Sequence, residues 1–312
     1  MKFSIAIPAY KSSYLREAVE SVISQTYDAW ELIVVDDCSP EDLQSVMAPF
    51  LTDSRIHYYR NENNYGAIDV VDNWNKCLNY CTGEYVICMG DDDRLKSNCI
   101  QEYKLLIDKY PDLNVFHART EIINENGEVI NLQEPRPEWE SALSLIWNRW
   151  SHRDKQYIGD FCYRSEWLKQ RGGYIKVPLA WGTDDMTAAK AAQEKGIANT
   201  QHFCFQYREN DQTITCNSDN AKTKILSTIA QYHWFTDLLA TFASQKLGDD
   251  DKKYLATIGT PRYFFFHTSF SNDCVKYIKG NPLRLLWCYR QLRDFHYTKM
   301  TFLKWYLKSI IV

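Results

Sequence analysis

Short apolar runs and amphipathic segments alternate along the first part of the chain. The apolar runs are read as strands at 3–7, 31–37, 55–60, 85–89 and 113–117. The amphipathic segments are read as helices near 15–23, 41–50, 70–81 and 97–109. In the first of these, apolar residues recur three and four positions apart, which gives a helix one buried face. Strands that alternate with helices predict an α/β fold with a mostly parallel sheet flanked by helices.

The pattern changes near Ser218, where long helical segments begin to follow one another without strands. We therefore expect an α/β domain over residues 1–217 and a C-terminal helical region over residues 218–312. Within the first domain, Asn126-Gly127 lies between EIIN and EVIN, which is typical of a β-hairpin.

The composition indicates a globular protein without a general affinity for nucleic acid. The chain has 312 residues, 45% of them hydrophobic, and a net charge of −4, whereas a surface that tracks phosphates needs an excess of basic residues. The ten cysteines form no CxxC pair, and the start MKFSIAIPAY lacks a signal-peptide pattern. We expect reduced cysteines and a cytoplasmic protein. A membrane span is not expected, because no run of about 18 apolar residues occurs.

Two of the expected strands end in carboxylates. ELIVVDD ends at Asp36 and Asp37, and YVICMGDDDRL carries Asp91, Asp92 and Asp93. Parallel strands bring such ends to one edge of the sheet, where ligands of open α/β folds bind. Adjacent carboxylates repel one another unless a cation or water compensates them. We favour a divalent metal held against a phosphorylated substrate, and the alternative is an exposed acidic turn that caps the next helix.

Another acidic pair opens a helix further along the chain. Asp184 and Asp185 follow Gly182 in LAWGTDDMTAAKAAQEKG, which reads as a helix that ends at Gly196. Acids in a first turn are favoured by the helix dipole alone, so this pair has a structural explanation as well as a functional one.

Taken together and in this order, five segments resemble the family 2 glycosyltransferases with the GT-A (Rossmann-like) fold. The resemblance covers roughly residues 3 to 215. The segments are SIAIPAYKSSYLREAVESVISQTYDAWELIVVDDCS, DNWNKCLNYCTGEYVICMGDDDRL, FCYRSEWLKQRGGY, WGTDDM and YRENDQTIT. The resemblance implies inverting transfer of a sugar from a nucleotide diphosphate sugar, often a UDP-sugar, to an acceptor hydroxyl.

The resemblance also implies a donor site at the strand ends. Tyr10 would stack on the nucleobase, and Asp37 would accept a hydrogen bond from it. The other residues that the resemblance places around the nucleotide are Pro8, Ala9, Gly66, Asn75, Asp91 and Asp92.

Asp91 to Asp93 occupy the DXD position of the family, where Mn²⁺ or Mg²⁺ would bridge carboxylates and diphosphate. The commoner family pattern is Leu-Asp-x-Asp-Asp, which places Gly90 at the first acid and leaves Asp92 and Asp93 as the retained pair. We assign Asp93 as the direct metal ligand and Asp91 as the second candidate ligand, with Asp91 and Asp92 contacting ribose or water.

The WGTDDM segment resembles the Glu-Asp motif of the family, whose Asp is the general base. By register the base is Asp185, and Asp184, which replaces the Glu, is the fallback. In YRENDQTIT, Asn210 stands where many relatives carry a His metal ligand. Because Asn is a weaker ligand, we expect lower metal affinity.

The expected acceptor is a lipid-linked glycan in the synthesis of a bacterial surface polysaccharide. The alternatives are a sugar nucleotidyltransferase, which would normally carry a Gly-rich basic loop where this chain reads PAYKSSYL, and a non-catalytic nucleotide-sugar or glycan-binding protein of the same fold.

The C-terminal tail segregates basic charge. Asp294 is the single acid in residues 281–312. In Lys299 to Val312, basic residues at helical spacing lie beside aromatic and aliphatic ones, which suits the interface of an anionic membrane at its inner face. The alternative is that this helix packs on the catalytic domain or on a second subunit. The basic residues of the tail are Arg284, Arg290, Arg293, Lys299, Lys304 and Lys308.

Overall fold

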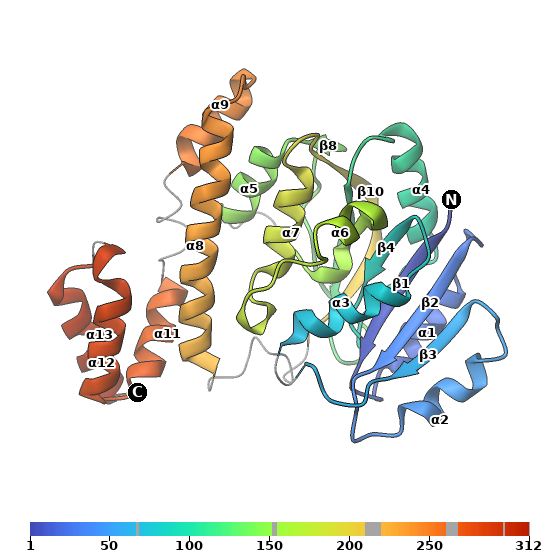
Figure 1. Cartoon of the computed structure of the whole chain (residues 1–312), viewed down its shortest axis with the longest axis horizontal. Coiled ribbons are helices and arrows are strands. Elements are labelled where there is room, and N and C mark those ends of the chain that lie inside the picture. The colour runs from blue at the N-terminus through green and yellow to red at the C-terminus, as the bar shows by residue number, and fades with distance from the viewer. Residues whose placement is uncertain (67–68, 152–154, 210–219, 260–267, 296, 312) are drawn as a thin grey trace. The chain divides into compact units, whose positions relative to one another are not determined.

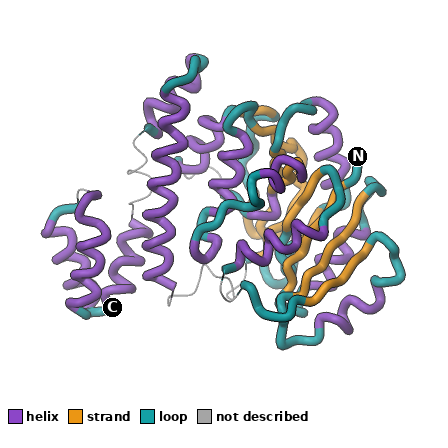
Figure 2. Tube along the Cα trace, viewed as in Figure 1, coloured by secondary structure: helices purple, strands orange, loops and turns teal. Residues whose placement is uncertain are grey.

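The computed structural model describes residues 1–66, 69–151, 155–209, 220–259, 268–295 and 297–311 (Figure 1). The chain divides into two compact units. Unit 1 comprises Met1–Lys176 and Thr183–Asn210, and unit 2 comprises Val177–Gly182 and Asp211–Val312. All strands of the described residues belong to unit 1 (Figure 2). The predicted boundary between residues 217 and 218 lies outside the described residues.

Unit 1 is built on a ten-stranded sheet with the order β3-β2-β1-β4-β9-β6-β10-β5, in which β7 also pairs with β6 and β8 with β10. The strands are β1 (Phe3–Ala9), β2 (Trp30–Asp36), β3 (Ile56–Arg60), β4 (Tyr85–Cys88), β5 (Arg94–Leu95), β6 (Val115–Ile123), β7 (Val129–Leu132), β8 (Trp139–Glu140), β9 (Phe161–Arg164) and β10 (Ile197–Arg208).

Most of the long strands share one direction. β1 runs parallel to β2 and β4, β2 to β3, and β6 to β10. β9 is antiparallel to both β4 and β6, so those two strands also point the same way. The mostly parallel α/β sheet expected from the sequence is therefore confirmed. The hairpin expected at Asn126-Gly127 is confirmed as well, since β6 pairs antiparallel with β7 and Gly127 has a φ of 80°.

Alternate residues of the inner strands fill a core on each face of the sheet. Phe3, Ile5 and Ile7 of β1 cluster with the apolar faces of α1 and α4, while α3 contacts β1 and β2, and α6 and α7 contact β9 and β6. The helices of unit 1 are α1 (Leu15–Ile23), α2 (Leu43–Met47), η1 (Ala48–Phe50), α3 (Val70–Tyr80), α4 (Cys99–Lys109), α5 (Ala142–Trp150), η2 (Ile158–Asp160), α6 (Ser165–Gln170) and α7 (Thr183–Ala192).

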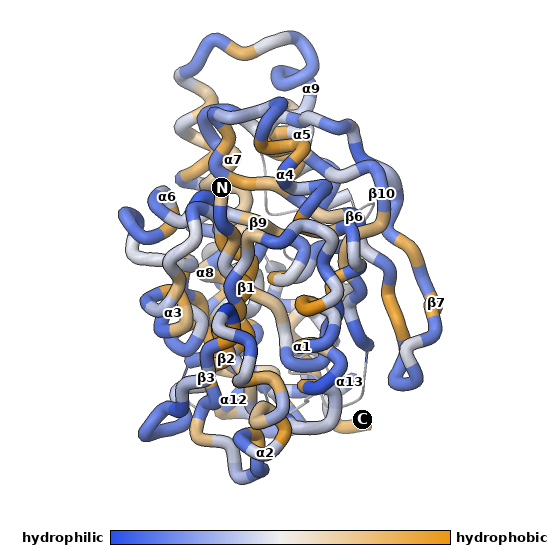
Figure 3. Tube along the Cα trace, turned by 90° about the vertical axis from the view of Figure 1, so that its right-hand side faces the viewer, coloured by the Kyte–Doolittle hydropathy of each residue, from blue (hydrophilic) through white to orange (hydrophobic). Residues whose placement is uncertain are grey.

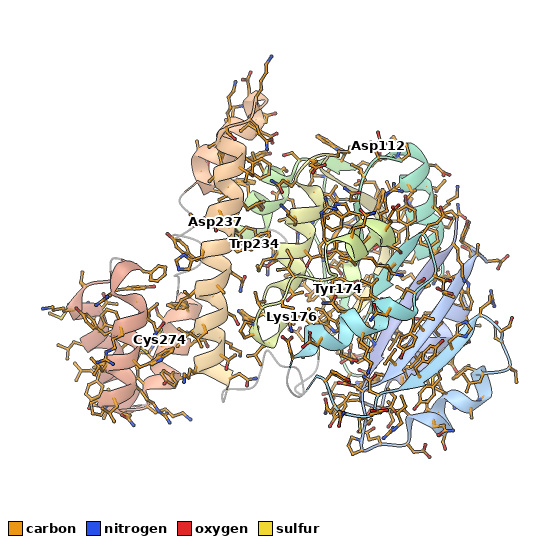
Figure 4. All side chains as sticks on the ribbon, in the orientation of Figure 1. Asp112, Tyr174, Lys176, Trp234, Asp237 and Cys274 are labelled. Carbon is orange, nitrogen blue, oxygen red and sulfur yellow. The ribbon has the colours of Figure 1, made fainter. Side chains whose placement is uncertain are left out.

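Unit 2 is helical in its described residues. It contains η3 (Pro178–Ala180), α8 (Ala221–Ala243), α9 (Asp249–Ile258), α11 (Thr268–Ile278), α12 (Pro282–Leu292), η5 (Arg293–Phe295) and α13 (Lys299–Ile311). Its core joins α8, α11, α12 and α13 around buried residues such as Phe270 and Trp305. Cys274, labelled in Figure 4, belongs to the same core. Among the described residues, no helix has the length and apolar character needed to cross a membrane.

The short segment that contains η3 is held by α8. Ser227 Oγ donates to the carbonyl oxygen of Pro178 at 2.7 Å, and Gln231 Nε2 donates to that of Trp181 at 2.6 Å. Leu179 and Ala180 have φ angles of 62° and 53°, a left-handed backbone that non-glycine residues rarely adopt.

The structure corrects the surface expected for the last helix. Phe302 and Trp305 are buried in the core of unit 2, because their face of α13 packs on α11 and α12. The exposed apolar residues of α13 are therefore mainly aliphatic: Met300, Leu303, Leu307, Ile310 and Ile311.

Candidate functional site

The acidic ends of β2 and β4 lie on either side of the loop that follows β1. Asp37 N donates to the carbonyl oxygen of Ala9 at 2.9 Å. On the other side, one carboxylate oxygen of Asp91 accepts from the backbone N–H groups of Tyr10 and Lys11, both at 2.7 Å. This placement follows from β1 running parallel between β2 and β4. The structure thus brings Pro8, Ala9 and Tyr10 to the same sheet edge as both acidic ends, as expected from the sequence.

Asp37 is surrounded by hydrogen-bond donors. Oδ1 accepts from Asn61 Nδ2 at 2.7 Å and from Tyr65 N at 2.9 Å, and Oδ2 accepts from Gly66 N at 2.6 Å. A Cβ atom on Gly66 would lie 2.9 Å from Oδ2, so a glycine is needed for this approach. A carboxylate has about four acceptor sites, so, counting the donors among the described residues, one remains on Oδ2 for a ligand donor.

The neighbouring Asp36 has a structural role. It is fully buried, and its Oδ2 accepts from the Tyr58 hydroxyl at 2.6 Å and from Arg60. Its Oδ1 accepts from Ser39 N at 2.8 Å. These contacts fix the turn that carries Asp37.

The three acids after β4 have different environments. Asp91 and Asp93 are buried, and Asp92 is half-buried. Burial raises the pKa of Asp91 to about 6, although the two loop amides oppose the shift. Burial and the adjacent charge of Asp92 raise the pKa of Asp93 well above its usual range. Buried carboxylates with raised pKa values bind protons or cations readily.

Arg208, at the end of β10, binds the acidic triplet through both its backbone and its side chain. Its N–H donates to Asp93 Oδ1 at 2.9 Å, and its Nε donates to the carbonyl oxygen of Asp92 at 2.8 Å. Its Nη2 forms an ion pair with Glu17 of α1 at 2.8 Å, and its guanidinium lies over the ring of Tyr14. The triplet is therefore tied to two other elements of unit 1.

The triplet can supply part of a coordination shell. No cluster of three or more His, Cys, Asp or Glu side chains suited to a metal occurs within the described residues. However, a Cβ atom built on Gly90 would lie 2.8 Å from Asp92 Oδ1 and 3.0 Å from Asp93 Oδ2, so these two oxygens converge on one spot. Mg²⁺ sites often use one or two carboxylates, with substrate phosphates and water completing the shell. The residues present fit a site of this kind.

Asp184 and Asp185 lie in the first turn of α7. Asp185 Oδ1 accepts from Arg149 Nε of α5 at 2.8 Å. Burial and the charge of Asp185 raise the pKa of Asp184 to about 7, and the charge of the buried Asp160 contributes. The same Asp160 also raises the pKa of Asp93. Both acidic groups therefore lie within electrostatic reach of Asp160.

Asn75, expected beside the nucleotide, forms hydrogen bonds with the backbone of Tyr174. Its Oδ1 accepts from Tyr174 N at 2.7 Å, and its Nδ2 donates to the carbonyl oxygen of Tyr174 at 3.3 Å (Figure 4). Lys176, in the same loop, pairs with Asp72 of α3 at 2.7 Å. Asn75 thus anchors this loop to α3. Asn210, the weaker ligand expected from the sequence, lies outside the described residues.

Several residues of the site carry no signal that marks them in the sequence. Asn61 and Glu17 are ordinary surface types in a loop and a helix, and Arg149 sits among tryptophans. Arg208 has a weak signal, because it is a lone arginine that ends an apolar strand within the YRENDQTIT segment.

Comparison with known proteins places this geometry in context. The model of a family described as Glycosyl transferase family 2 matches residues 4–171, more than half of the chain. The Escherichia coli UDP-Glc:alpha-D-GlcNAc-diphosphoundecaprenol beta-1,3-glucosyltransferase WfgD is 30% identical over 134 residues, which cover 43% of this chain and 51% of that protein. Four further curated relatives are matched over 32% to 39% of their own lengths. The chain thus spans about half or less of the length of these relatives.

Solved structures share the fold. Staphylococcus aureus TarS 1–349 in complex with UDP-GlcNAc has a TM-score of 0.62 at 15% identity, covering 98% of this chain and 91% of that one. The mannosyltransferase PcManGT from Pyrobaculum calidifontis, in complex with GDP-Man and Mn²⁺, has a TM-score of 0.53 at 14% identity, covering 99% and 84%. At these identities the likeness shows the GT-A fold.

Proposed function

The chain belongs to glycosyl transferase family 2, and on this premise we propose that it transfers a sugar from a nucleotide diphosphate sugar to an acceptor hydroxyl. The observation that carries the proposal is that Asp37 and Asp91 both meet the Ala9–Lys11 loop at the carboxyl edge of the sheet. This edge is where an open α/β sheet binds nucleotides. The transfer proceeds with inversion at the anomeric carbon.

A UDP-sugar is the donor that suits this edge. The free acceptor site on Asp37 Oδ2 matches the ring N–H of uracil, and the 40% exposed Tyr10 offers a face on which the base can stack. TarS was crystallised with UDP-GlcNAc and WfgD is named for UDP-Glc. The transferred group is a hexosyl or N-acetylhexosaminyl group.

Asp93, with Asp91 and Asp92 beside it, would hold Mn²⁺ or Mg²⁺ against the diphosphate. When bound, the metal neutralises the charge that develops on the leaving group. The protein residues hold the carboxylates in place through Arg208 and the loop amides.

Asp185 takes the proton of the acceptor hydroxyl as its oxygen attacks the anomeric carbon from the side opposite the diphosphate. The new C–O bond forms while the old C–O bond breaks, and the electron pair leaves with the nucleotide diphosphate. Asp184 is the fallback for this role.

The acceptor is a lipid-linked glycan used to build a bacterial surface polysaccharide. The name of WfgD gives a diphosphoundecaprenol-linked sugar as its acceptor. We extend this acceptor class to the present chain on the strength of the family and the C-terminal surface described next.

The hairpin of α12 and α13 offers a surface for an anionic membrane at its inner face. Gly280 N donates to Ser309 Oγ at 3.0 Å, and the rings of Tyr289 and Phe302 meet at 5.3 Å, so the two helices run antiparallel. Leu283 is 75% exposed and Ile311 is 86% exposed, and both lie at the same end of the hairpin. Exposed lysines and arginines accompany them. Exposed aliphatic residues flanked by cations bind anionic interfaces.

Liposome sedimentation of the full-length chain tests the membrane contact. Leu303→Gln with Leu307→Gln should reduce binding to anionic vesicles at low salt. The matched control is Leu105→Gln on α4 of unit 1, a leucine with the same 54% exposure as Leu307. Equal binding by the double variant and the control would exclude this surface.

The competing functions are separated by one assay series. We expect UDP with Mn²⁺ or Mg²⁺ to raise the melting temperature, and one UDP-sugar of a panel to release UDP when a lipid-linked acceptor is added. A nucleotidyltransferase would instead form a nucleotide sugar from UTP and a sugar phosphate. A non-catalytic binder would be stabilised by the nucleotide sugar without releasing UDP from any donor.

A further inference from the structure

The two carboxylates that open α7 differ in their partners. Two side chains donate to Asp185, and both donate to the same oxygen, Oδ1. They are Arg149, through Nε at 2.8 Å, and Gln156, through its amide nitrogen at 2.8 Å. Within the described part of the chain, no side chain donates to Asp184, and Oδ2 of Asp185 accepts no hydrogen bond.

The direction of the Gln156 amide is fixed by the residue behind it. The guanidinium of Arg136 has only donors, so Gln156 turns its carbonyl oxygen to Arg136, accepting at 3.1 and 3.2 Å, and its NH₂ group to Asp185. Arg136 is itself buried and lies 3.8 Å from Glu140. Gln156 therefore acts as a donor to Asp185.

These contacts place the two acids in different surroundings. A cation and an amide donor lie against Asp185, whereas Asp184 is half-buried beside that carboxylate and its pKa is raised to about 7. The titratable groups that face the pair are Arg149 from α5, Asp160 from η2 and Tyr163 from β9. Asp160 adds negative charge, and burial raises the pKa of Tyr163 and keeps it neutral. A proton taken up by the pair near neutral pH therefore goes to Asp184.

We propose that Arg149 and Gln156 are positioning residues that make Asp185 the proton acceptor of the pair. Held at Oδ1, Asp185 offers Oδ2 to the acceptor hydroxyl, while Asp184 carries the proton that the pair takes up. This inference rests on the proposed glycosyl transfer, in which one ionised carboxylate must face the attacking hydroxyl.

Melting temperatures show which of the two carboxylates, Asp184 or Asp185, takes up the proton, without an activity assay. At pH 8, Asp184→Asn should melt several degrees above the wild type, because it removes a half-buried charge, and the gain should shrink as the pH falls below about 7 and vanish at about pH 3.5, where the unfolded chain also protonates this group. Asp185→Asn should melt below the wild type at both pH values, because Arg149 loses its partner. A gain at pH 8 in Asp185→Asn instead of Asp184→Asn would overturn the assignment.

The pH profile of UDP release then tests the positioning role. Arg149→Met and Gln156→Leu should lower kcat, with the larger loss in Arg149→Met, and should leave the affinity for UDP and Mn²⁺ within twofold of the wild type. Loss of the cation should also move the acid limb of kcat to higher pH. A merely structural role would leave that limb in place. The matched control is Arg171→Met, which replaces an exposed arginine at the C-terminal end of α6. It should change neither kcat nor the position of its acid limb.

The outcomes separate this inference from the proposed function. If UDP binds but Asp185→Asn keeps its UDP release, the assignment of the base is wrong and the family activity stands. If no donor of the panel releases UDP in the wild type, the proposed function and the base role both fall, while the melting data still decide which carboxylate holds the proton.

Discussion

Replacing Arg208 by methionine removes a buried clamp under the acidic triplet. The Arg208 side chain is fully buried. Its guanidinium donates to the carbonyl oxygen of Asp92 at 2.8 Å and to the carboxylate of Glu17 at 2.8 Å. It also donates to the carbonyl oxygens of Asn124 and Glu125 at 3.1 and 2.9 Å. Methionine fills a similar space but has no donor. The carbonyl groups of Asp92 and Glu125 then lose this donor, and that of Asn124 keeps the bond from Gly127 N at 3.0 Å. Glu17, which is half-exposed, regains water and keeps its ion pair with Arg94.

The magnitude follows from these contacts. Three part-buried hydrogen bonds to carbonyl groups contribute about 0.5–1.5 kcal/mol each, and the ion pair with the half-exposed Glu17 adds at most about 1 kcal/mol. The desolvation of a buried guanidinium, which the variant no longer requires, offsets part of this loss. We expect the free energy of unfolding to fall by about 2–4 kcal/mol, which lowers the melting temperature by roughly 4–16 °C for a unit of this size.

Thermal and urea unfolding of the full-length chain measure this loss. Arg171→Met is the matched control, because Arg171 is exposed and its guanidinium lies over the ring of Trp167. It should change the stability by less than about 1 kcal/mol. Because the triplet loses its support, Arg208→Met should also weaken Mn²⁺-dependent UDP binding, and Arg208→Lys should fall between it and the wild type. A melting temperature within 2 °C of the wild type for Arg208→Met would refute the reasoning, since the smallest expected loss of about 2 kcal/mol corresponds to roughly 4 °C.

Three further predictions concern the acids and their neighbours. Asp93→Asn should abolish most metal-dependent UDP binding measured by calorimetry, and Asp91→Asn should reduce it less; an unchanged metal dependence in Asp93→Asn would contradict the assignment. Gly66→Ala should weaken UDP binding and lower stability, because the new methyl group would meet Asp37 Oδ2 at 2.9 Å. Burial opposes the ionisation of Glu31, but ammonium, hydroxyl and amide donors outweigh it and lower its pKa to about 2. The wild type should therefore lose about 2–3 kcal/mol relative to Glu31→Gln as the pH falls from about 4.5 to 2, and none above that range, as urea unfolding would show.

The parts of the fold that follow from periodicity were predictable from the sequence. The strands that end in Asp36 and near Asp91 are short apolar runs, and parallel pairing alone places their ends at one edge. The strand expected at 113–117 is longer in the structure, where β6 extends to Ile123 and accommodates the β7 hairpin. The short apolar run ends at Ala118, and Arg119, Thr120 and Glu121 follow it, so the apolar pattern alone does not reveal the extension.

The donors around each acid could not be predicted. Gln156 and Arg149 reach Asp185 from distant parts of the chain, and their contact depends on how α5 packs against α7. The same limit explains the tail, where the pattern of α13 showed aromatic and aliphatic residues together but gave no indication of which would be buried. Burial of Phe302 and Trp305 depends on the partners α11 and α12.

The exposed β7 strand is another feature that only the structure shows. Val129, Ile130 and Leu132 are each about half exposed, and Figure 3 shows the apolar strand of this hairpin (orange) at one side of the view. β7 pairs with β6 off the main order of the sheet. The sequence alone presents it as an ordinary apolar strand.

The segment of residues 177–182 limits how freely the C-terminal helices can be exchanged. It belongs to unit 2, yet the chain enters it from unit 1 and returns to unit 1 one residue before Asp184. Its left-handed turn is held by Ser227 and Gln231 of α8. A chimera that grafts a different C-terminal region after residue 210 therefore inherits a unit 1 with an unanchored turn next to Asp184 and Asp185. Exchanging the C-terminal helices between relatives requires moving this segment and α8 together, so the two are expected to be inherited and engineered as one piece.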